Sequence, residues 1–320
     1  MKALRISDGR LDTVEVPIPQ PENGQALVKV LKAGICGTDL EMLKGYAGFT
    51  GTPGHEFVGT VESAPGLPGL CGQRVAADIN CGCGKCSWCK FGDPRHCSKR
   101  SVIGIRGKNG AFAEYLTVPV KNLYPVADSI DDIRAVFAEP LAAALEIAQQ
   151  VHVRNSDRIL VLGDGRLGLL AAAALKHYTG NLVIAGRHPE KLSVAEKMGV
   201  KTVESGAPPP EGGFDLVVEA TGSPEGIQTA LDLVRAEGTV IVKTTTAGQS
   251  SLDLSSVVVN EITVTGSRCG DIGLALRFLE HGWVDPHPLV EKVYPFSSAK
   301  EAFRHAQSRG SLKIILDISE

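Results

Sequence analysis

The sequence has little of what marks membrane, secreted or nucleic-acid-binding proteins. Its longest apolar stretch, Leu167 to Leu175, is interrupted by Gly168 and is far shorter than the roughly 20 residues that span a bilayer. The N-terminus, MKALRISDGRLDTVEVP, is charged throughout and has no apolar signal core. Lys and Arg total 33 against 36 acids, with no basic arm, so no nucleic-acid or membrane partner is expected. We expect a cytoplasmic protein.

Aromatic residues are also scarce, at 5% of the chain, and they do not outline a substrate pocket. Tyr46 and Phe49, between the two metal motifs described below, are the candidates for lining it. The 320 residues, 43% hydrophobic and 22% charged, have the composition of an ordinary globular protein, and their number suits two domains of roughly 100–200 residues.

The pattern changes near residue 150. Before it, Gly and Pro separate short apolar runs, which predicts a mainly β domain with long loops; the runs are Ala26–Leu31, Phe57–Val61, Arg74–Ala77 and Ala113–Val118. From Arg158 to about Gly282, strand and helix patterns alternate, which predicts an α/β domain with a parallel sheet. Its predicted strands are Ile159–Leu162, Leu182–Ala185, Leu216–Glu219, Val240–Lys243 and Ile262–Thr265, and its helices are Leu167–Lys176, Glu190–Met198 and Glu225–Val234.

The C-terminal segment is predicted to return to the first domain, with a helix at Ser298–Gln307 and a strand at Lys313–Asp317. The predicted domains are therefore 1–150 with 286–320, and 151–285. Pro208–Pro210, followed by Glu211-Gly212-Gly213, is predicted to be a surface loop.

Four of the eight cysteines lie in one short segment, about 81–98. Cys83, Cys86, Cys89 and Cys97 have the spacing C-x2-C-x2-C-x7-C, which brings four thiolates around one centre and predicts a closed structural zinc site. Gly82, Gly84 and Gly92 would permit the tight turns. Disulfides or an iron–sulfur cluster are the alternatives. Cys71, Cys81 and Cys269 are predicted to be free thiols.

A second metal site is indicated by Cys36 and His55. Both lie in glycine-rich loops, within Gly34-Ile35-Cys36-Gly37-Thr38-Asp39 and Gly54-His55-Glu56. A catalytic zinc needs about three protein ligands and one exchangeable position. Glu56 or a distant carboxylate would complete the set.

A dinucleotide site is indicated by Gly163-Asp164-Gly165-Arg166-Leu167-Gly168, between a buried strand and a helical run. The first glycine permits a tight turn, the second lets the backbone approach a pyrophosphate, and the third allows the helix to pack on the strand. The phosphates would face the helix N-terminus. A purely structural turn is the alternative.

The ribose 2′ position is predicted from the end of the next strand, Ile184-Ala185-Gly186-Arg187-His188. NAD binders usually place an acid there. Gly186 occupies that slot and leaves space, while Arg187 offers a forked cation to a 2′-phosphate. NADP(H) is therefore favoured over NAD(H). The alternative is that Arg187 stacks on adenine or faces solvent.

The order of these motifs resembles the zinc-dependent medium-chain dehydrogenases, in particular the alcohol, polyol and threonine dehydrogenases. The resemblance covers essentially the whole chain. It implies a GroES-like catalytic domain beside a Rossmann domain, two zinc ions per chain, and a homodimer or homotetramer. It also implies hydride transfer between an alcohol, with polyols or secondary alcohols favoured, and the nicotinamide cofactor, with zinc polarising the substrate oxygen where the two domains meet.

The resemblance assigns roles to particular residues. Cys36 and His55 would be catalytic zinc ligands, and Glu56 is the family's carboxylate beside the histidine. Glu139, in Glu139-Pro140-Leu141, matches the acidic ligand of the polyol branch. Asp39 would hold the ligating histidine; a loop cap is the alternative.

Thr38 matches the hydroxyl that takes the alcohol proton. The family often has a histidine three residues later, and Glu41 stands there instead, which leaves the proton exit open. Near the nicotinamide, Thr221 lies in Glu219-Ala220-Thr221-Gly222 and Arg268 in Gly266-Ser267-Arg268-Cys269-Gly270; for Arg268 a surface salt bridge is the alternative.

Two other classes of function share part of this pattern. A zinc-free quinone-reductase-like relative would lack Cys36, His55 and Glu139 together, and the chain has all three. A nonenzymatic nucleotide sensor or zinc-ribbon protein would bind about one zinc ion instead of two.

Overall fold

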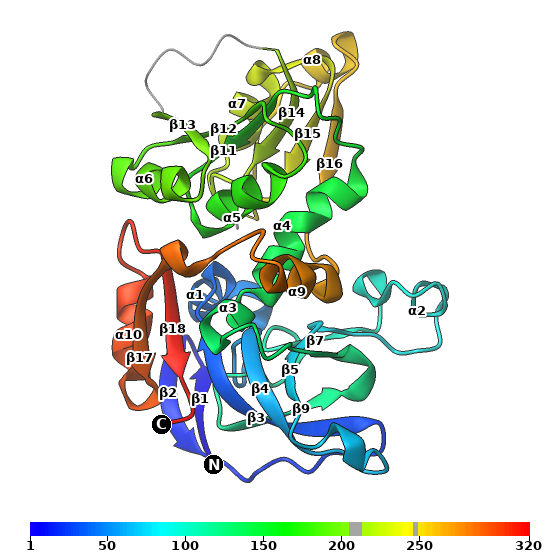
Figure 1. The fold of residues 1–320 in the computed structure, drawn as a ribbon, viewed down its shortest axis with the longest axis vertical. Coiled ribbons are helices and arrows are strands. Elements are labelled where there is room, and N and C mark those ends of the chain that lie inside the picture. The colour runs from blue at the N-terminus through cyan, green and yellow to red at the C-terminus, as the bar shows by residue number, and fades with distance from the viewer. Residues whose placement is uncertain (205–212, 246–248) are drawn as a thin grey trace. The chain divides into compact units, whose positions relative to one another are not determined.

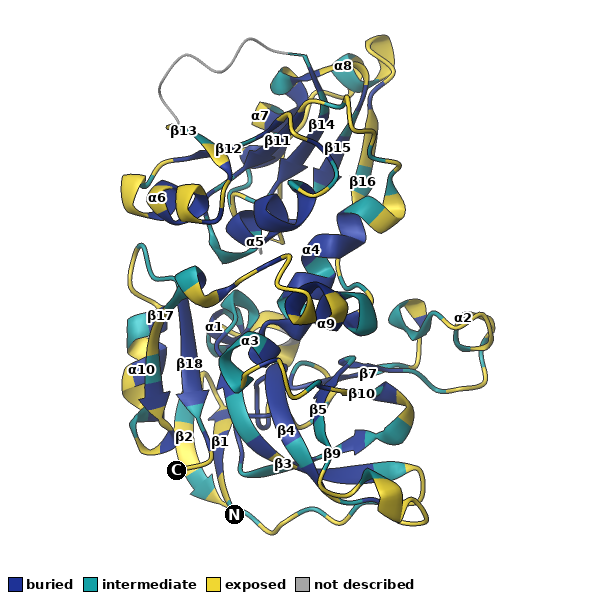
Figure 2. Cartoon of the chain, in the orientation of Figure 1, coloured by how far each residue is buried: buried dark blue, intermediate teal, exposed yellow. Residues whose placement is uncertain are grey.

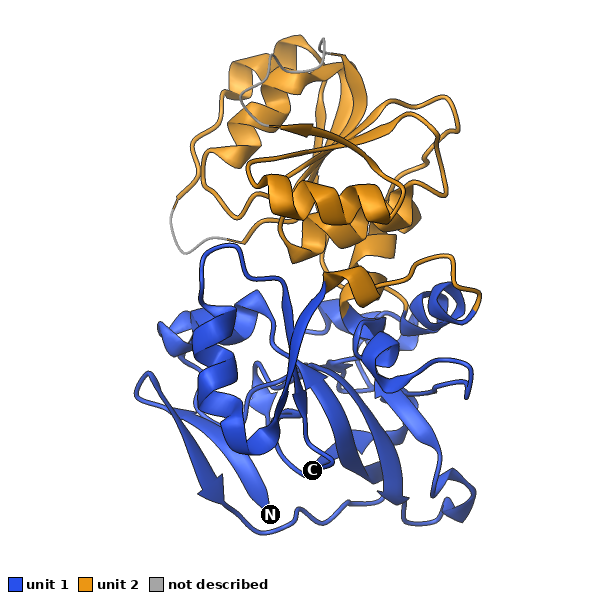
Figure 3. Ribbon diagram, turned by 60° about the vertical axis from the view of Figure 1, so that its left-hand side comes forward, with its two compact units in different colours: residues 1–139, 272–280, 290–320 blue, residues 140–271, 281–289 orange. Residues whose placement is uncertain are grey.

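The computed structural model describes residues 1–204, 213–245 and 249–320, which divide into two compact units (Figure 3). The first unit is Met1–Glu139, Ile272–Glu280 and Val290–Glu320, and the second is Pro140–Asp271 and His281–Leu289. The division falls inside helix α4 (Ala138–Gln150), upstream of the boundary at 150 drawn from the sequence. The loop predicted at Pro208–Pro210 lies outside the described residues.

The second unit is built on a six-stranded sheet whose neighbouring strands are all parallel (Figure 1). Across the sheet the strands are β13 (Lys201–Glu204), β12 (Leu182–Gly186), β11 (Ile159–Leu162), β14 (Phe214–Glu219), β15 (Val234–Val242) and β16 (Thr263–Gly266). Its helices are α5 (Arg166–Leu175), α6 (Pro189–Lys197), α7 (Gly226–Leu233) and α8 (Leu254–Val259). The order is that of a doubly wound nucleotide-binding sheet, which confirms the α/β prediction.

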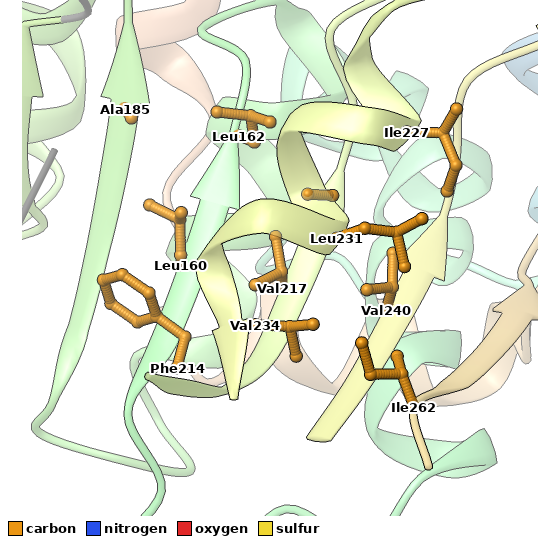
Figure 4. Packing of buried hydrophobic residues seen from close by; sticks show 11 residues of the cluster. Leu160, Leu162, Ala185, Phe214, Val217, Ile227, Leu231, Val234, Val240 and Ile262 are labelled. Atoms are coloured by element: carbon orange, nitrogen blue, oxygen red, sulfur yellow. The ribbon is translucent and has the colours of Figure 1, made fainter. Parts of the chain in front are cut away.

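The buried strands of this sheet read as continuous apolar runs. All four residues of β11 are buried, as expected for a parallel strand with both faces covered. One cluster joins the sheet to α7, whose Ile227 and Leu231 pack with Leu160 and Val217 of the sheet (Figure 4).

Register brings the functional loops of the second unit to one edge. Leu162, the last residue of β11, pairs with Ala185 of β12 and Glu219 of β14. Val242 of β15 pairs with Gly266 of β16. The loops that follow these strands therefore leave the sheet at its carboxyl edge, where ligands of open α/β sheets bind.

The first unit is mainly β. Its seven-stranded sheet runs β10-β5-β4-β3-β18-β17, with β9 paired to β3. The strands are β3 (Gln25–Gly34), β4 (Glu56–Ser63), β5 (Arg74–Ala77), β9 (Tyr115–Pro119), β10 (Leu123–Pro125), β17 (Val290–Pro295) and β18 (Lys313–Asp317). Because β18 pairs with β3, the C-terminal segment does return to this unit, as the sequence predicted.

Several elements of the first unit were not predicted from the sequence, whereas helix α10 (Ala299–Ala306) was predicted at Ser298–Gln307. The hairpin β1 (Lys2–Ser7) and β2 (Arg10–Glu15) turns at Asp8-Gly9, a dipeptide typical of two-residue hairpin turns. A small sheet contains β6 (Asn80–Cys81), β7 (Ser101–Ile103) and β8 (Gly107–Lys108). The helices are α1 (Gly37–Leu43), α2 (Ser87–Lys90), α3 (Asp132–Val136), α9 (Ile272–Glu280) and α10 (Ala299–Ala306). Within the described residues, no helix has the length and apolar character needed to cross a membrane.

Candidate active site

Two groups of metal-ligating side chains occur among the described residues, and both were predicted from the sequence. The first is Cys36, His55 and Glu56, whose ligand atoms lie within 4.8 Å of one another. Cys36 precedes α1, and His55 precedes β4, which begins at Glu56. His55 and Glu56 are 3% and 2% exposed. A thiolate, an imidazole and a carboxylate around one buried point suit zinc.

Asp39 lies beneath this cluster and is fully buried. One of its carboxylate oxygens accepts the backbone N–H of Cys36 at 2.8 Å, and the other accepts that of Gly54 at 3.2 Å. The latter oxygen is 3.5 Å from Nδ1 of His55, a buried nitrogen that has no hydrogen-bond partner in the structure. A small shift would satisfy it and leave Nε2 for a metal, which is the role predicted for Asp39.

The charges around His55 favour a cation. Burial opposes protonation of the imidazole, but the Asp39 carboxylate and Cys36 outweigh it and hold the pKa of His55 well above its usual range. A bound metal ion would supply the positive charge that Asp39 and Cys36 favour, and the imidazole of His55 would then be neutral. The residues present therefore fit a zinc ion.

Lys313, which sequence reasoning missed, forms a buried ion pair with Glu56. Their side chains are 3% and 2% exposed. The pair lies over Gly34 of β3, between β4 and β18. A Cβ at Gly34 would come within 2.7 Å of Oε2 of Glu56 and 3.3 Å of Cδ of Lys313, so only glycine leaves room for the pair.

Glu139, the predicted acidic ligand, lies in the first turn of α4. It is not a member of the three-residue cluster, but it interacts electrostatically with His55, Glu56 and Lys313. Burial raises the pKa of Glu139 to about 7, with His55 opposing and Glu56 adding to the shift. Its carboxylate therefore belongs to the same charged pocket as the cluster.

Thr38 is positioned beside the cluster. Its hydroxyl is 3.8 Å from Sγ of Cys36. Glu41, one turn later on α1, is paired at 2.7 Å with Lys44 on the surface. Tyr46 and Phe49 lie around the 3-10 turn Tyr46–Gly48; their predicted part in a pocket stays a prediction.

The second metal group is Cys83, Cys86, Cys89 and Cys97. Gly84 and Gly92 have positive φ, of 74° and 84°, as the tight turns require. Gly82 serves differently, because a Cβ there would lie 2.7 Å from Sγ of Cys89. Backbone N–H groups of Lys85 and Cys86 lower the pKa of Cys83 to about 6. All eight cysteines are described and none forms a disulfide, which excludes that alternative for this segment.

The glycine-rich loop of the second unit has the expected conformation. Gly163 has a φ of 114°, Gly165 caps α5, and a Cβ at Gly168 would lie 2.0 Å from the carbonyl oxygen of Gly163. A Cβ at Gly165 would meet nothing within 4 Å, so its open side is free for a pyrophosphate. Arg166 and Leu167 begin α5.

The sequence analysis predicted free space at Gly186, but this position is occupied. The side chain of Asp164 fills it, and a Cβ at Gly186 would lie 2.4 Å from Cβ and from Oδ2 of Asp164. Oδ2 accepts the backbone N–H groups of Arg187 and His188, each at 2.7 Å. Arg187 is exposed, and His188 caps α6.

Two further loops lie at the carboxyl edge of the same sheet. Glu219, 1% exposed, accepts hydrogen bonds from the backbone N–H and hydroxyl of Thr221 and from the hydroxyl of Thr244, at 2.7 to 2.8 Å. The ammonium of Lys243 donates to the carbonyl of Arg268 at 3.2 Å and to that of Ala143 at 2.7 Å. These contacts fix the loops that carry Thr221 and Arg268.

Comparison with known proteins agrees with this arrangement. Two family models match, an alcohol dehydrogenase GroES-like domain over residues 22–128 and a zinc-binding dehydrogenase over residues 167–280. A sorbitol dehydrogenase of Halalkalibacterium halodurans is 30% identical over 340 residues, covering 99% of both chains.

Two solved structures are similar over nearly the whole chain. An alcohol dehydrogenase from Escherichia coli CFT073, complexed with NADH, has a TM-score of 0.92 and 26% identity, and 99% of each chain is covered. A protein assigned as a zinc-binding dehydrogenase from Sinorhizobium meliloti 1021, bound to NADP, has a TM-score of 0.89 and 28% identity, covering 99% of this chain and 98% of that one. The chain belongs to the zinc-dependent medium-chain dehydrogenase/reductase family, and it is an oxidoreductase of the alcohol dehydrogenase class.

Proposed function

We propose that the protein is a zinc-dependent dehydrogenase that interconverts a polyol or other secondary alcohol and its ketone, with NADP(H) favoured over NAD(H). The observation that carries the proposal is the buried cluster of Cys36, His55 and Glu56, with Asp39 beneath it. The similarity to a sorbitol dehydrogenase supports the polyol class. Exposed Arg187 beside the ribose position supports NADP(H).

The candidate ligands of the catalytic zinc are Cys36, His55, Glu56 and Glu139, and the four cysteines of 83–97 would hold the structural zinc. When bound, the catalytic zinc supplies Lewis acidity toward the substrate oxygen, and the nicotinamide supplies the hydride chemistry. Asp39 orients His55 through Nδ1. The hydroxyl of Thr38 takes the proton of the substrate hydroxyl and passes it on toward solvent. Glu41, three residues later on α1, lies on the same helix face and can receive it.

Lys313 restrains Glu56 within this set. Because the Glu56 carboxylate already has Lys313 as its cation partner, a metal ion would have to compete with the lysine for it. Glu139 forms no ion pair with the described residues, so its ionised form would gain more from a metal charge. Glu139 would therefore complete the resting ligand set, and Glu56 would bind the metal only if its contact with Lys313 loosened.

A metal and activity assay tests the proposal. Purified protein should contain about two zinc ions per chain and oxidise members of a secondary-alcohol and polyol panel, assayed with each cofactor. Cys36→Ser should reduce the zinc content to about one ion and abolish turnover. Cys71→Ser is the matched control, since Cys71 is an exposed free thiol and its loss should change neither. A wild type with about one zinc ion and no turnover on any alcohol or carbonyl would favour a rival class.

We also propose that the chain forms a homodimer through the β16 edge of the second unit. β16 is the last strand of its sheet, and much of the neighbouring helix α8 is coloured as exposed in Figure 2. Its exposed residues include three apolar ones, Leu254 at 67%, Val258 at 75% and Val259 at 78%. An unpaired strand edge beside an apolar patch favours pairing with a second copy. Light scattering after size exclusion should show a dimer, and Val259→Glu should shift it to monomer; a monomeric wild type would contradict this.

A further inference from the structure

The side chain of Asp164 occupies the position where nucleotide-binding sheets usually carry a different residue. β11 and β12 are the first two strands of the βαβ unit, and the acid that reads the ribose normally stands at the end of the second strand. Here that residue is Gly186, and the Asp164 carboxylate from the glycine-rich loop lies where a side chain at 186 would be. The glycine is therefore required by Asp164 and does not mark an empty slot.

The Asp164 carboxylate is held firmly and stays ionised. Oδ2 accepts two backbone N–H groups, from Arg187 and His188, and Nδ1 of His188 lies 3.0 Å from it. Burial works against the charge, but these hydrogen bonds lower the pKa of Asp164 below its usual range. Among the described residues, the other oxygen, Oδ1, has a contact only with His188 Nδ1, at 3.1 Å, so it retains capacity to accept another hydrogen bond.

We propose that Asp164 is the specificity-determining acid of the adenosine ribose: its Oδ1 accepts the 2′-hydroxyl of NAD(H), and its charge opposes the 2′-phosphate of NADP(H). This inference rests on the proposed function, because it assumes that the second unit binds a dinucleotide. Arg187, next to the same carboxylate, provides the opposing attraction for a 2′-phosphate. The site thus carries one group for each cofactor, and Asp164 limits the preference for NADP(H) that Arg187 creates.

The alternative is that Asp164 has a structural role only, in which its hydrogen bonds stabilise the turn after β12. Asp164→Asn separates the two, because the amide oxygen of asparagine can still accept the backbone N–H groups while the negative charge is lost. A structural role predicts equal changes in the binding of both cofactors. A specificity role predicts opposite changes.

The experiment is a direct titration of the zinc-loaded protein with NADH and with NADPH, followed by nicotinamide fluorescence. For Asp164→Asn we expect weaker NADH and tighter NADPH binding, so that the ratio of the two dissociation constants shifts roughly ten- to a hundredfold toward NADPH, the range for one hydrogen bond to a charged group. Asp157→Asn is the matched control, since Asp157 lies before β11, at the opposite end of that strand, and also accepts a backbone N–H. Its ratio should stay that of the wild type.

A ratio that Asp164→Asn leaves unchanged, or shifts toward NADH, would overturn the inference. A second design moves the carboxylate back to the strand: Gly186→Asp alone should be destabilised by contact with Asp164, whereas Asp164→Gly with Gly186→Asp should restore stability and the wild-type ratio. If the double variant folds but prefers NADPH as strongly as Asp164→Asn, a carboxylate at this place does not set the cofactor preference, and the inference fails. A wild type that binds neither nucleotide refutes the proposed function itself, whatever the variants do.

Discussion

Removing Lys313 should expose how much the buried pair with Glu56 contributes to stability. Lys313→Met keeps an unbranched apolar side chain but leaves Glu56, 2% exposed, without its cation. The lysine also donates to the carbonyl of Ile35 at 3.4 Å and lies 5.8 Å from the centre of the Phe137 ring. Breaking one partner out of a buried ion pair costs about 3–5 kcal/mol, a large part of the roughly 5–15 kcal/mol that stabilises a typical protein.

The stability loss caused by Lys313→Met should depend on whether zinc is bound. In metal-stripped protein, urea unfolding followed by circular dichroism should show the full loss for Lys313→Met. In zinc-loaded protein the loss should be smaller, because the metal supplies a positive charge near Glu56. Adding Glu56→Gln to Lys313→Met should recover most of the loss in stripped protein, with a coupling energy of at least about 2 kcal/mol.

Lys300→Met provides the control, because its ion pair with Asp12 is on the surface, with both side chains more than half exposed. Its unfolding midpoint should match the wild type. The reasoning would be refuted by a Lys313→Met variant as stable as the wild type in stripped protein, or by one that Glu56→Gln makes still less stable.

Three other predictions follow from the sites. Glu139→Gln should lose more catalytic zinc than Glu56→Gln, measured as metal retained after dialysis against a chelator, because Glu56 is paired with a lysine and Glu139 is not; equal retention would argue against this division of roles. Gly165→Ala should fold normally yet bind dinucleotide poorly, since its Cβ meets no protein atom and points into the space for the pyrophosphate. Gly168→Ala should instead lower the melting temperature, because its Cβ would lie 2.0 Å from the carbonyl oxygen of Gly163; normal melting would contradict that packing argument.

The sequence alone was sufficient for most of the features whose information is local. The βα series was readable because apolar runs, glycines and helix patterns repeat over short distances, and its predicted strands and helices differ from the observed ones mostly at their ends. The four-cysteine segment and the Cys36, His55 and Glu56 group were also predictable, since their ligands lie in short motifs. The hairpin at Asp8-Gly9 was missed although its turn dipeptide was visible.

Tertiary structure decided the contacts between side chains that are remote in sequence. Lys313 begins a strand whose next three residues are apolar and buried, a signal that a buried partner was needed. Only the pairing of β18 with β3 and of β3 with β4 shows that the partner is Glu56. In the same way, the absence of an acid at residue 186 suggested free space for a phosphate. The register of β11 and β12 places Asp164 in that space, because strand pairing brings together loops whose relation no local pattern encodes.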